Sequence, residues 1–276
     1  MMDIKNNVYY FDQNVWQHFF EKIEAEKIAE HLRIGGVAIY LSTHNVYEFG
    51  RMLLSGDRND ENKVSGFFKY LFDLCGHIRF IKEPHDLILD DISYARNSGK
   101  ILPFLNVANT GLSKQEIYNI AHGNNGKAVD FIKRRESRVE SGCGILDEKA
   151  RKLNSGADEI KFEKERDNVC SRREILRNSK YGKETTNLSD GLLFSEPARY
   201  PFLNTFINSQ LYLNYLAAFK INAKSQNHVS DLRHLILANA AKKFVTMDER
   251  LIKLSGKVCP YIETLNLEGF MRIENF

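Results

Sequence analysis

Two aspartates each follow a stretch with the composition of a buried β-strand. Asp12 comes directly after Val8-Tyr9-Tyr10-Phe11, and Asp248 comes two residues after Phe244-Val245-Thr246. In α/β proteins, a carboxylate at the C-terminal end of a strand faces the crevice in which such folds bind ligands. The positions of these two aspartates therefore suggest a metal-centred active site.

Two further acids take equivalent positions. Glu48 follows a second apolar strand, 37–42, in what we predict is the first turn of a helix, and Asp231 opens a late helix. Right-handed crossovers bring the carboxyl ends of parallel strands to the same edge of a sheet. Carboxylates that converge there raise one another's pKa unless a cation lies among them. Oxygen ligands without a cysteine cluster favour Mg²⁺ or Mn²⁺, as one ion or two, over zinc.

Water bound to such an ion suggests attack on a phosphodiester. The metal would lower the pKa of the water, neutralise the phosphate oxygens and stabilise the leaving alkoxide. Each acid also has a purely structural explanation: Asp12, Asp231 and Asp248 could cap helices, and Glu48 could complement a helix dipole. The expected meeting of all four at one sheet edge favours the metal site.

Neighbouring polar residues could support these acids. Thr246 could orient Asp248 or its water through its hydroxyl, or could serve the sheet alone. Asn14 and Asn45 could supply neutral ligands or hydrogen bonds to the ligands, although turns and caps also select asparagine. His234 is a candidate to hydrogen-bond a metal ligand or to contact a phosphate.

The elements around these residues alternate between strand and helix. We predict strands at 8–11, 37–42, 77–81, 244–246 and 258–262. This alternation predicts an α/β fold with one parallel, doubly wound sheet. Between about 98 and 201 the strand patterns disappear and charged helical patterns take over, so a helical insertion separates the core segments 1–97 and 202–276.

The composition limits the alternatives. A chain of 276 residues that is 43% hydrophobic can bury a substantial core. We find no apolar stretch long enough to span a membrane and no signal-peptide pattern at the start, so we expect a cytoplasmic protein without a membrane partner. The four cysteines are scattered, which indicates reduced thiols rather than a zinc site. The net charge of +3 is too small to indicate a nucleic-acid partner by itself.

Basic residues outnumber acids within the predicted insertion. Lys133, Arg134, Arg135 and Arg138 form a cluster that could bind nucleic acid. Solvated helix faces explain such a cluster more simply. The insertion could therefore bind RNA, hold an inhibitor, form an oligomer or have no specific function.

Taken together, these segments resemble the PIN-domain nucleases. The matching segments are Tyr9-Tyr10-Phe11-Asp12-Gln13-Asn14, Leu41-Ser42-Thr43-His44-Asn45-Val46-Tyr47-Glu48, and Ser230-Asp231-Leu232-Arg233-His234 through Phe244-Val245-Thr246-Met247-Asp248. The resemblance covers roughly 1–97 and 202–276. It implies a three-layer α/β/α fold in which the four acids bind divalent metal and cleave RNA, or DNA as in flap-type relatives.

Three functions follow from these patterns. The first is a metal-dependent endoribonuclease, acting as a toxin or defence effector under the control of a protein partner. The second is a catalytically inactive PIN-like module that binds nucleic acid or protein. The third is a phosphohydrolase of the haloacid dehalogenase type, which also begins with a strand and an aspartate but requires a second aspartate where this chain has Asn14.

Overall fold

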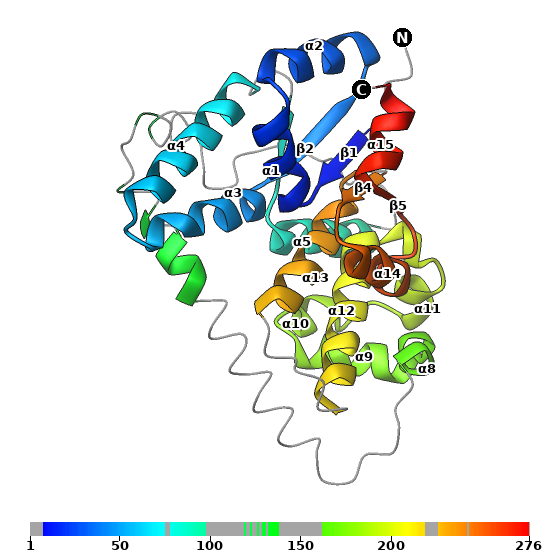
Figure 1. The fold of residues 1–276 in the computed structure, drawn as a ribbon. Helices are drawn as coiled ribbons and strands as arrows, with labels where there is room; N and C mark the ends of the chain where they lie inside the picture. The colour runs from blue at the N-terminus through cyan, green and yellow to red at the C-terminus, as the bar shows by residue number, and fades with distance from the viewer. Residues whose placement is uncertain are drawn as a thin grey trace.

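The protein has a single five-stranded sheet in which all neighbouring strands are parallel (Figure 1). The computed structural model describes residues 8–74, 78–97, 162–218, 226–241 and 243–275, and shorter pieces between 119 and 137. The strands are β1 (Val8–Phe11), β2 (Ala38–Ser42), β3 (Ile78–Ile81), β4 (Lys243–Thr246) and β5 (Glu263–Asn266). Helices cover both faces, which confirms the predicted three-layer α/β/α architecture.

The sequence of strand β1 is apolar without interruption because both of its faces are buried. Successive side chains of a strand point to opposite faces. Tyr9 and Phe11 enter one hydrophobic core and Tyr10 enters the other, and all three are fully buried. A strand covered by helices on both faces has no side that can be polar.

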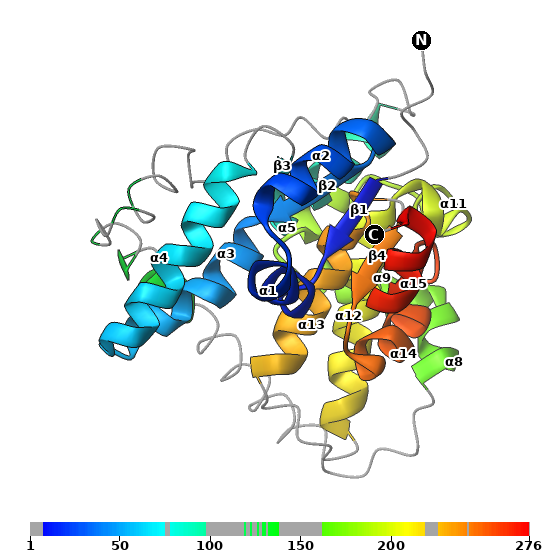
Figure 2. The same cartoon turned by 45° about the horizontal axis from the view of Figure 1, so that its top comes forward.

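The first helical layer covers the face that holds Tyr9 and Phe11 (Figure 2). It consists of α1 (Gln13–Lys22), α2 (Ala25–Gly35), α3 (Thr43–Gly50), α4 (Arg58–Asp73) and α15 (Leu267–Glu274), with the short 3₁₀ helix η1 (Arg51–Leu54) between α3 and α4. The segment between β1 and β2 forms two helices rather than one, because the backbone of Ile23 is extended and ends α1.

The second layer covers the opposite face. It consists of α5 (Pro84–Arg96), α12 (Pro201–Ala218), α13 (Gln226–Ala238) and α14 (Glu249–Val258). The described part of the predicted insertion adds α8 (Phe162–Asp167), α9 (Val169–Asn178), α10 (Gly182–Thr185), α11 (Asp190–Phe194) and η2 (Pro197–Arg199). Leu176 and Leu193 of these helices share one hydrophobic cluster with Tyr10 and Phe244 of the sheet. The helices of 162–201 are thus continuous with the core of this layer.

Three predicted boundaries were wrong. Val258 belongs to the buried face of α14 rather than to a strand, and the last strand begins at Glu263. Helix α13 begins at Gln226, so Asp231 lies in its second turn and is not its N-cap. Helix α3 begins at Thr43 with Ser42 as N-cap, so Glu48 also lies beyond the first turn.

The strand order β3-β2-β1-β4-β5 places a topological switch point between β1 and β4. From β1 the chain moves outward to β2 and β3 on one side, and later to β4 and β5 on the other. The crevice at the carboxyl ends of such a strand pair is where open α/β sheets bind ligands. Among the described helices, none combines the length and apolar character needed to cross a membrane.

Candidate active site

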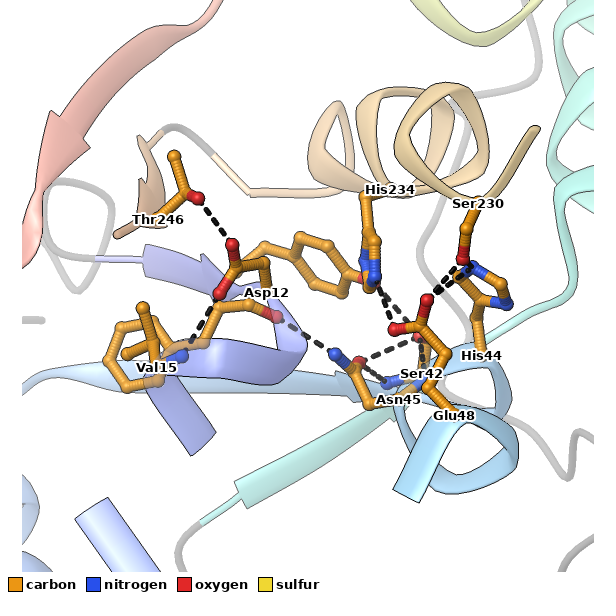
Figure 3. A network of polar contacts seen from close by, with 11 residues as sticks. Asp12, Val15, Ser42, His44, Asn45, Glu48, Ser230, His234 and Thr246 are labelled. Atoms are coloured by element: carbon orange, nitrogen blue, oxygen red, sulfur yellow. Dashed lines mark hydrogen bonds and ion pairs between the residues drawn. The ribbon is translucent and has the colours of Figure 1, made fainter. Parts of the chain in front are cut away.

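Asp12 lies at this switch point, immediately after β1 (Figure 3). It caps helix α1, because its Oδ1 accepts a hydrogen bond from the Val15 amide at 3.0 Å. Its Oδ2 accepts from the hydroxyl of Thr246, at the end of β4. Burial raises the pKa of the Asp12 carboxyl, and the Thr246 hydrogen bond opposes that rise. The side chain of Thr246 therefore orients Asp12, while its oxygen accepts from the backbone amide of Asp248 at 3.0 Å.

The end of β2 is fixed by a capping box. The amide of Ser42 donates to Oδ1 of Asn45 at 3.0 Å, and Ser42 Oγ accepts from the Asn45 amide at 3.2 Å. The side-chain nitrogen of Asn45 donates to the carbonyl of Phe11 at 3.0 Å. Asn45 therefore ties the start of α3 to the end of β1, whereas Asn14 is exposed on α1.

Glu48 is the centre of a polar cluster between α3 and α13 (Figure 3). Its Oε2 lies 2.7 Å from Nε2 of His234, and its Oε1 accepts from the hydroxyl of Ser230. Nε2 of His44 lies 2.8 Å from Ser230 Oγ and 3.6 Å from Oε1 of Glu48. On the far side of the His234 ring, Nδ1 is hydrogen-bonded to the Tyr10 hydroxyl at 2.8 Å.

The surroundings keep Glu48 charged. Burial alone would raise the pKa of its carboxyl, but His234 and His44 together with the hydrogen bonds bring it well below its usual range. Burial works to lower the pKa of His234, and Glu48 reverses this and raises it. Burial lowers the pKa of His44 well below its usual range. The cluster therefore favours an ionised Glu48, the protonated form of His234 and the neutral form of His44.

Asp231 and Asp248 form a second, outer pair that shares one cation. Nη2 of Arg250 lies 3.0 Å from Oδ2 of Asp231 and 3.6 Å from Oδ2 of Asp248. Asp248 also caps α14, accepting from the amides of Arg250 at 2.7 Å and Leu251 at 3.2 Å. Burial raises the pKa of Asp231 to about 6, although Arg250 opposes the change.

The fold thus brings all four predicted acids to one sheet edge, in two groups. The charge of Glu48 acts on both Asp12 and Asp231, which shows that the groups are close enough to interact. In the part of the chain that the structure describes, the set of possible metal ligands within 4.8 Å of one another is His44, Glu48 and His234. The tightest group therefore contains two imidazoles, which the sequence-based quartet did not include.

The ligand atoms of His44, Glu48 and His234 are close enough together to hold one metal ion. Tyr10 holds Nδ1 of His234 and turns Nε2 toward Glu48, where a metal ion would have to displace the proton of this nitrogen. Nδ1 of His44 is buried and has no hydrogen-bond partner among the described residues. If neutral His44 carries its proton on Nε2, that nitrogen donates to Ser230 and only the acceptor Nδ1 is left unpaired. His44 therefore serves better as a hydrogen-bond donor to Ser230 than as a metal ligand. Carboxylates with one histidine are compatible with Mg²⁺ or Mn²⁺.

The same geometry argues against a serine nucleophile. Ser230 and His44 are within hydrogen-bond distance, as a nucleophile and its base would be. A Ser-His-acid relay requires a carboxylate on the other ring nitrogen. That nitrogen of His44 has no hydrogen-bond partner in the part of the chain that the structure describes, and Glu48 lies on the Nε2 side instead.

From the sequence, no catalytic or metal-binding role was predicted for Tyr10, His44 or Ser230. A signal for two of them exists, because His44 and Glu48 are spaced i,i+4, and so are Ser230 and His234. Residues at that spacing lie on one face of a helix. Only the packing of α3 against α13 shows that the two faces meet.

The predicted basic cluster is divided. Lys133 and Arg134 are exposed, and Arg134 Nε donates to the carbonyl of Asp130 at 3.2 Å. Arg135 is mostly buried, with Nη1 2.7 Å from Oε1 of Glu83 and its guanidinium over the Tyr47 ring. Arg138 lies outside the described residues.

Comparison with protein-family models, with curated proteins and with solved structures found no match.

Proposed function

We propose that this chain is a metal-dependent endonuclease of the PIN type that cleaves RNA. The observation that carries the proposal is the placement of Glu48. It is a largely enclosed carboxylate that its neighbours keep ionised, and it interacts with Asp12 and Asp231 at the switch point of a parallel sheet. Clustered, ionised carboxylates at such an edge are suited to a divalent cation.

The residues of the chain have separate tasks in this proposal. A bound Mg²⁺ or Mn²⁺, one ion or two, would neutralise a phosphate and lower the pKa of an attacking water. Asp12 and Glu48 would hold the ion from the inside of the crevice, and Asp231 and Asp248 from its rim. Thr246 and Tyr10 fix the orientation of Asp12 and His234. Arg250, which is 54% exposed, lies where an incoming phosphate would meet a cation.

Substrate and setting rest on chemistry and on the resemblance to PIN-domain nucleases. That resemblance favours RNA, with DNA as the other substrate to be tested. A ribonuclease active in the cytoplasm would damage its own cell, so the proposal includes an inhibitory or regulatory protein partner, as for a toxin or defence effector.

A cleavage assay tests the proposal. Purified protein is incubated with single-stranded RNA, structured RNA and DNA in Mg²⁺, in Mn²⁺ or in EDTA. Asp12→Asn and Asp248→Asn should abolish cleavage, since asparagine keeps both helix caps but removes a charge. Asp57→Asn is the matched control, because Asp57 caps α4 on the exposed surface. Cleavage that persists in EDTA or in both site variants would contradict the proposal.

One observation favours a second function, a PIN-like module that binds nucleic acid or protein without catalysis. Ser230 and His234 already satisfy Glu48, and Arg250 bridges Asp231 and Asp248. Because these carboxylates already have hydrogen-bond and ion-pair partners within the protein, they would be stable without a bound metal ion. Calorimetric titration with Mn²⁺ separates the two functions, because the binding module would take up none. A haloacid dehalogenase-type activity lacks its second aspartate, since position 14 is an exposed asparagine.

A further inference from the structure

A cavity of about 620 Å³ lies on the far side of α13 from Glu48. Its walls come from α5, α12, α13 and the Lys180-Tyr181 segment before α10, which Figure 1 shows grouped below the sheet. Helix α13 serves both sites. Ser230 and His234 face Glu48, whereas Leu232, Arg233 and Ile236 line the cavity.

The inner wall of the cavity is apolar and aromatic. Tyr181 and Phe206 meet edge to face, with ring centroids 5.1 Å apart and planes at 82°. Ile88 and Leu213 complete this part of the lining. Aromatic faces stack with nucleobases of any sequence, because every base has a π-face.

The remaining wall carries polar groups suited to a nucleotide. The ammonium of Lys180 lies 5.2 Å from the centre of the Tyr181 ring, which places a cation beside the aromatic surface. Gln210 lines the cavity, and its side-chain amide makes no hydrogen bond within the described residues. An amide offers both a donor and an acceptor, which is what the edge of a base requires. The cavity thus combines a stacking surface, a group that can pair with a base and a cation for a phosphate.

The cavity is also connected to the candidate active site. Arg135 lines it, pairs with Glu83, and donates to Oγ1 of Thr43 at 3.4 Å. Thr43 directly precedes His44 on α3. Arg135 therefore joins a wall of the cavity to α3, the helix that carries Glu48.

We propose that this cavity binds one unstacked nucleotide of a single-stranded RNA whose backbone lies across the acids. This inference rests on the proposed nuclease function and adds its substrate class. The base packs against the partly exposed Phe206, whose ring contacts the buried Tyr181, and pairs with Gln210, and Lys180 neutralises the adjacent phosphate. A volume of about 620 Å³ is of the size that holds one small ligand and is too small for a duplex.

Equilibrium binding in EDTA tests the cavity without any cleavage. The probe is a short fluorescein-labelled single-stranded RNA followed by fluorescence anisotropy, with the corresponding duplex as a second probe. Lys180→Ala and Gln210→Ala should each weaken single-strand binding by about tenfold, the effect of losing one contact to the phosphate or to the base. Lys183→Ala is the control, because Lys183 is an exposed lysine on nearby α10 outside the cavity lining. Circular dichroism melting confirms that each variant is folded.

The outcomes separate this proposal from the nuclease itself. Unchanged binding by both cavity variants, or a preference for the duplex, overturns the cavity proposal even if the wild type cleaves RNA. Weakened binding in both variants supports it even if no cleavage occurs in Mn²⁺, a result that would overturn only the nuclease. If adenosine 5′-monophosphate binds the cavity and the single strand does not, the site takes a free nucleotide and the proposal fails.

Discussion

Two regions of this protein bury an acid, and they shift its pKa in opposite directions. At the contact between α5 and α12, Asp91 is fully buried, and its Oδ2 accepts from the Leu203 amide at 2.9 Å. Its Oδ1 has no hydrogen-bond partner among the described residues. Burial raises the pKa of this carboxyl to about 8, so Asp91 is mostly neutral at neutral pH.

At the sheet edge, Glu48 is also largely enclosed, yet its pKa lies below the usual range. The difference lies in the neighbours, since His44, His234 and Ser230 surround Glu48 while Asp91 meets a backbone amide. Burial alone neutralises an acid, and a carboxylate stays charged only where other groups support it. The sheet edge is therefore organised to hold charge, whereas Asp91 serves as a cap for α12.

The strongest test of this contrast is Glu48→Gln. We expect cleavage to fall by about 100-fold or more, equivalent to ~2.7 kcal/mol of transition-state stabilisation, because the charge at the centre of the cluster is lost. The change in unfolding free energy should be ~1 kcal/mol, since glutamine still accepts from Ser230. Single-turnover kinetics in Mn²⁺ and denaturant unfolding measure the two effects. The control is Glu61→Gln, because Glu61 is exposed on the first turn of α4. Equal cleavage rates for the two variants would show that Glu48 takes no part in the reaction.

Asp91→Asn tests the other region through the pH dependence of stability. Folding raises the pKa of Asp91 from about 4 to about 8, so the protonated carboxyl contributes its full stability to the fold below about pH 4. This contribution is lost as the pH rises through about 8. We therefore expect the wild type to lose stability between these values. The variant should lose less and should be more stable than the wild type at pH 8 by ~1 kcal/mol. Thermal melts across this range make the measurement.

Asp90→Asn is the matched control for that experiment. Asp90 adjoins Asp91 on α5 but is partly exposed and paired with Lys82 at 2.8 Å. Its substitution should leave the pH dependence unchanged. If both variants behave like the wild type, Asp91 is not the neutral acid described above.

Thr246→Val probes how the edge supports its carboxylates. The substitution removes the hydroxyl that donates to Asp12 and accepts from the Asp248 amide, at a cost of ~1 kcal/mol. Because the Thr246 hydrogen bond lowers the pKa of Asp12, its loss should raise that pKa. The acidic limb of the pH–rate profile should then move to higher pH, and Thr246→Ser should restore it. A profile that stays in place would show that Asp12 does not control the rate.

Arg250→Ala should have the smallest effect. The guanidinium is half exposed, so its loss should change the unfolding free energy by less than ~0.5 kcal/mol. Removing this cation from Asp231 and Asp248 should tighten Mn²⁺ binding by about threefold, because two charges of the same sign no longer compete. Calorimetry provides the test, and weaker Mn²⁺ binding would mean that Arg250 supports the site rather than competing with an ion.

The sequence predicted the parts of this site that depend on local signals. Asp12 and Asp248 were found because each follows a short apolar strand, and the parallel sheet was found from the alternation of strand and helix. Asp231 was misplaced as a cap because Ser and Asp are favoured at helix starts, whereas α13 begins earlier, at Gln226. Val258 is apolar and β-branched, but its place on the buried face of α14 overrides its strand propensity.

Other parts could not be predicted from local patterns. His44 and Ser230 meet across 186 positions of the chain, and neither residue signals its partner. The cavity beside α13 depends on how α5, α12 and the Lys180-Tyr181 segment pack together. Such contacts are set by tertiary packing and leave no periodic trace in the sequence.

The central position of β1 has a consequence for synthesis. Its neighbour β4 begins at Lys243, and the partner of Glu48, His234, lies 186 positions further along the chain. A growing chain that has already produced Asp12 and Glu48 still lacks α13 and β4, because synthesis proceeds from the N-terminus. The acids therefore converge only after α13 and β4 have been made and β4 has paired with β1. The order of the strands itself therefore delays the moment at which the four acids come together.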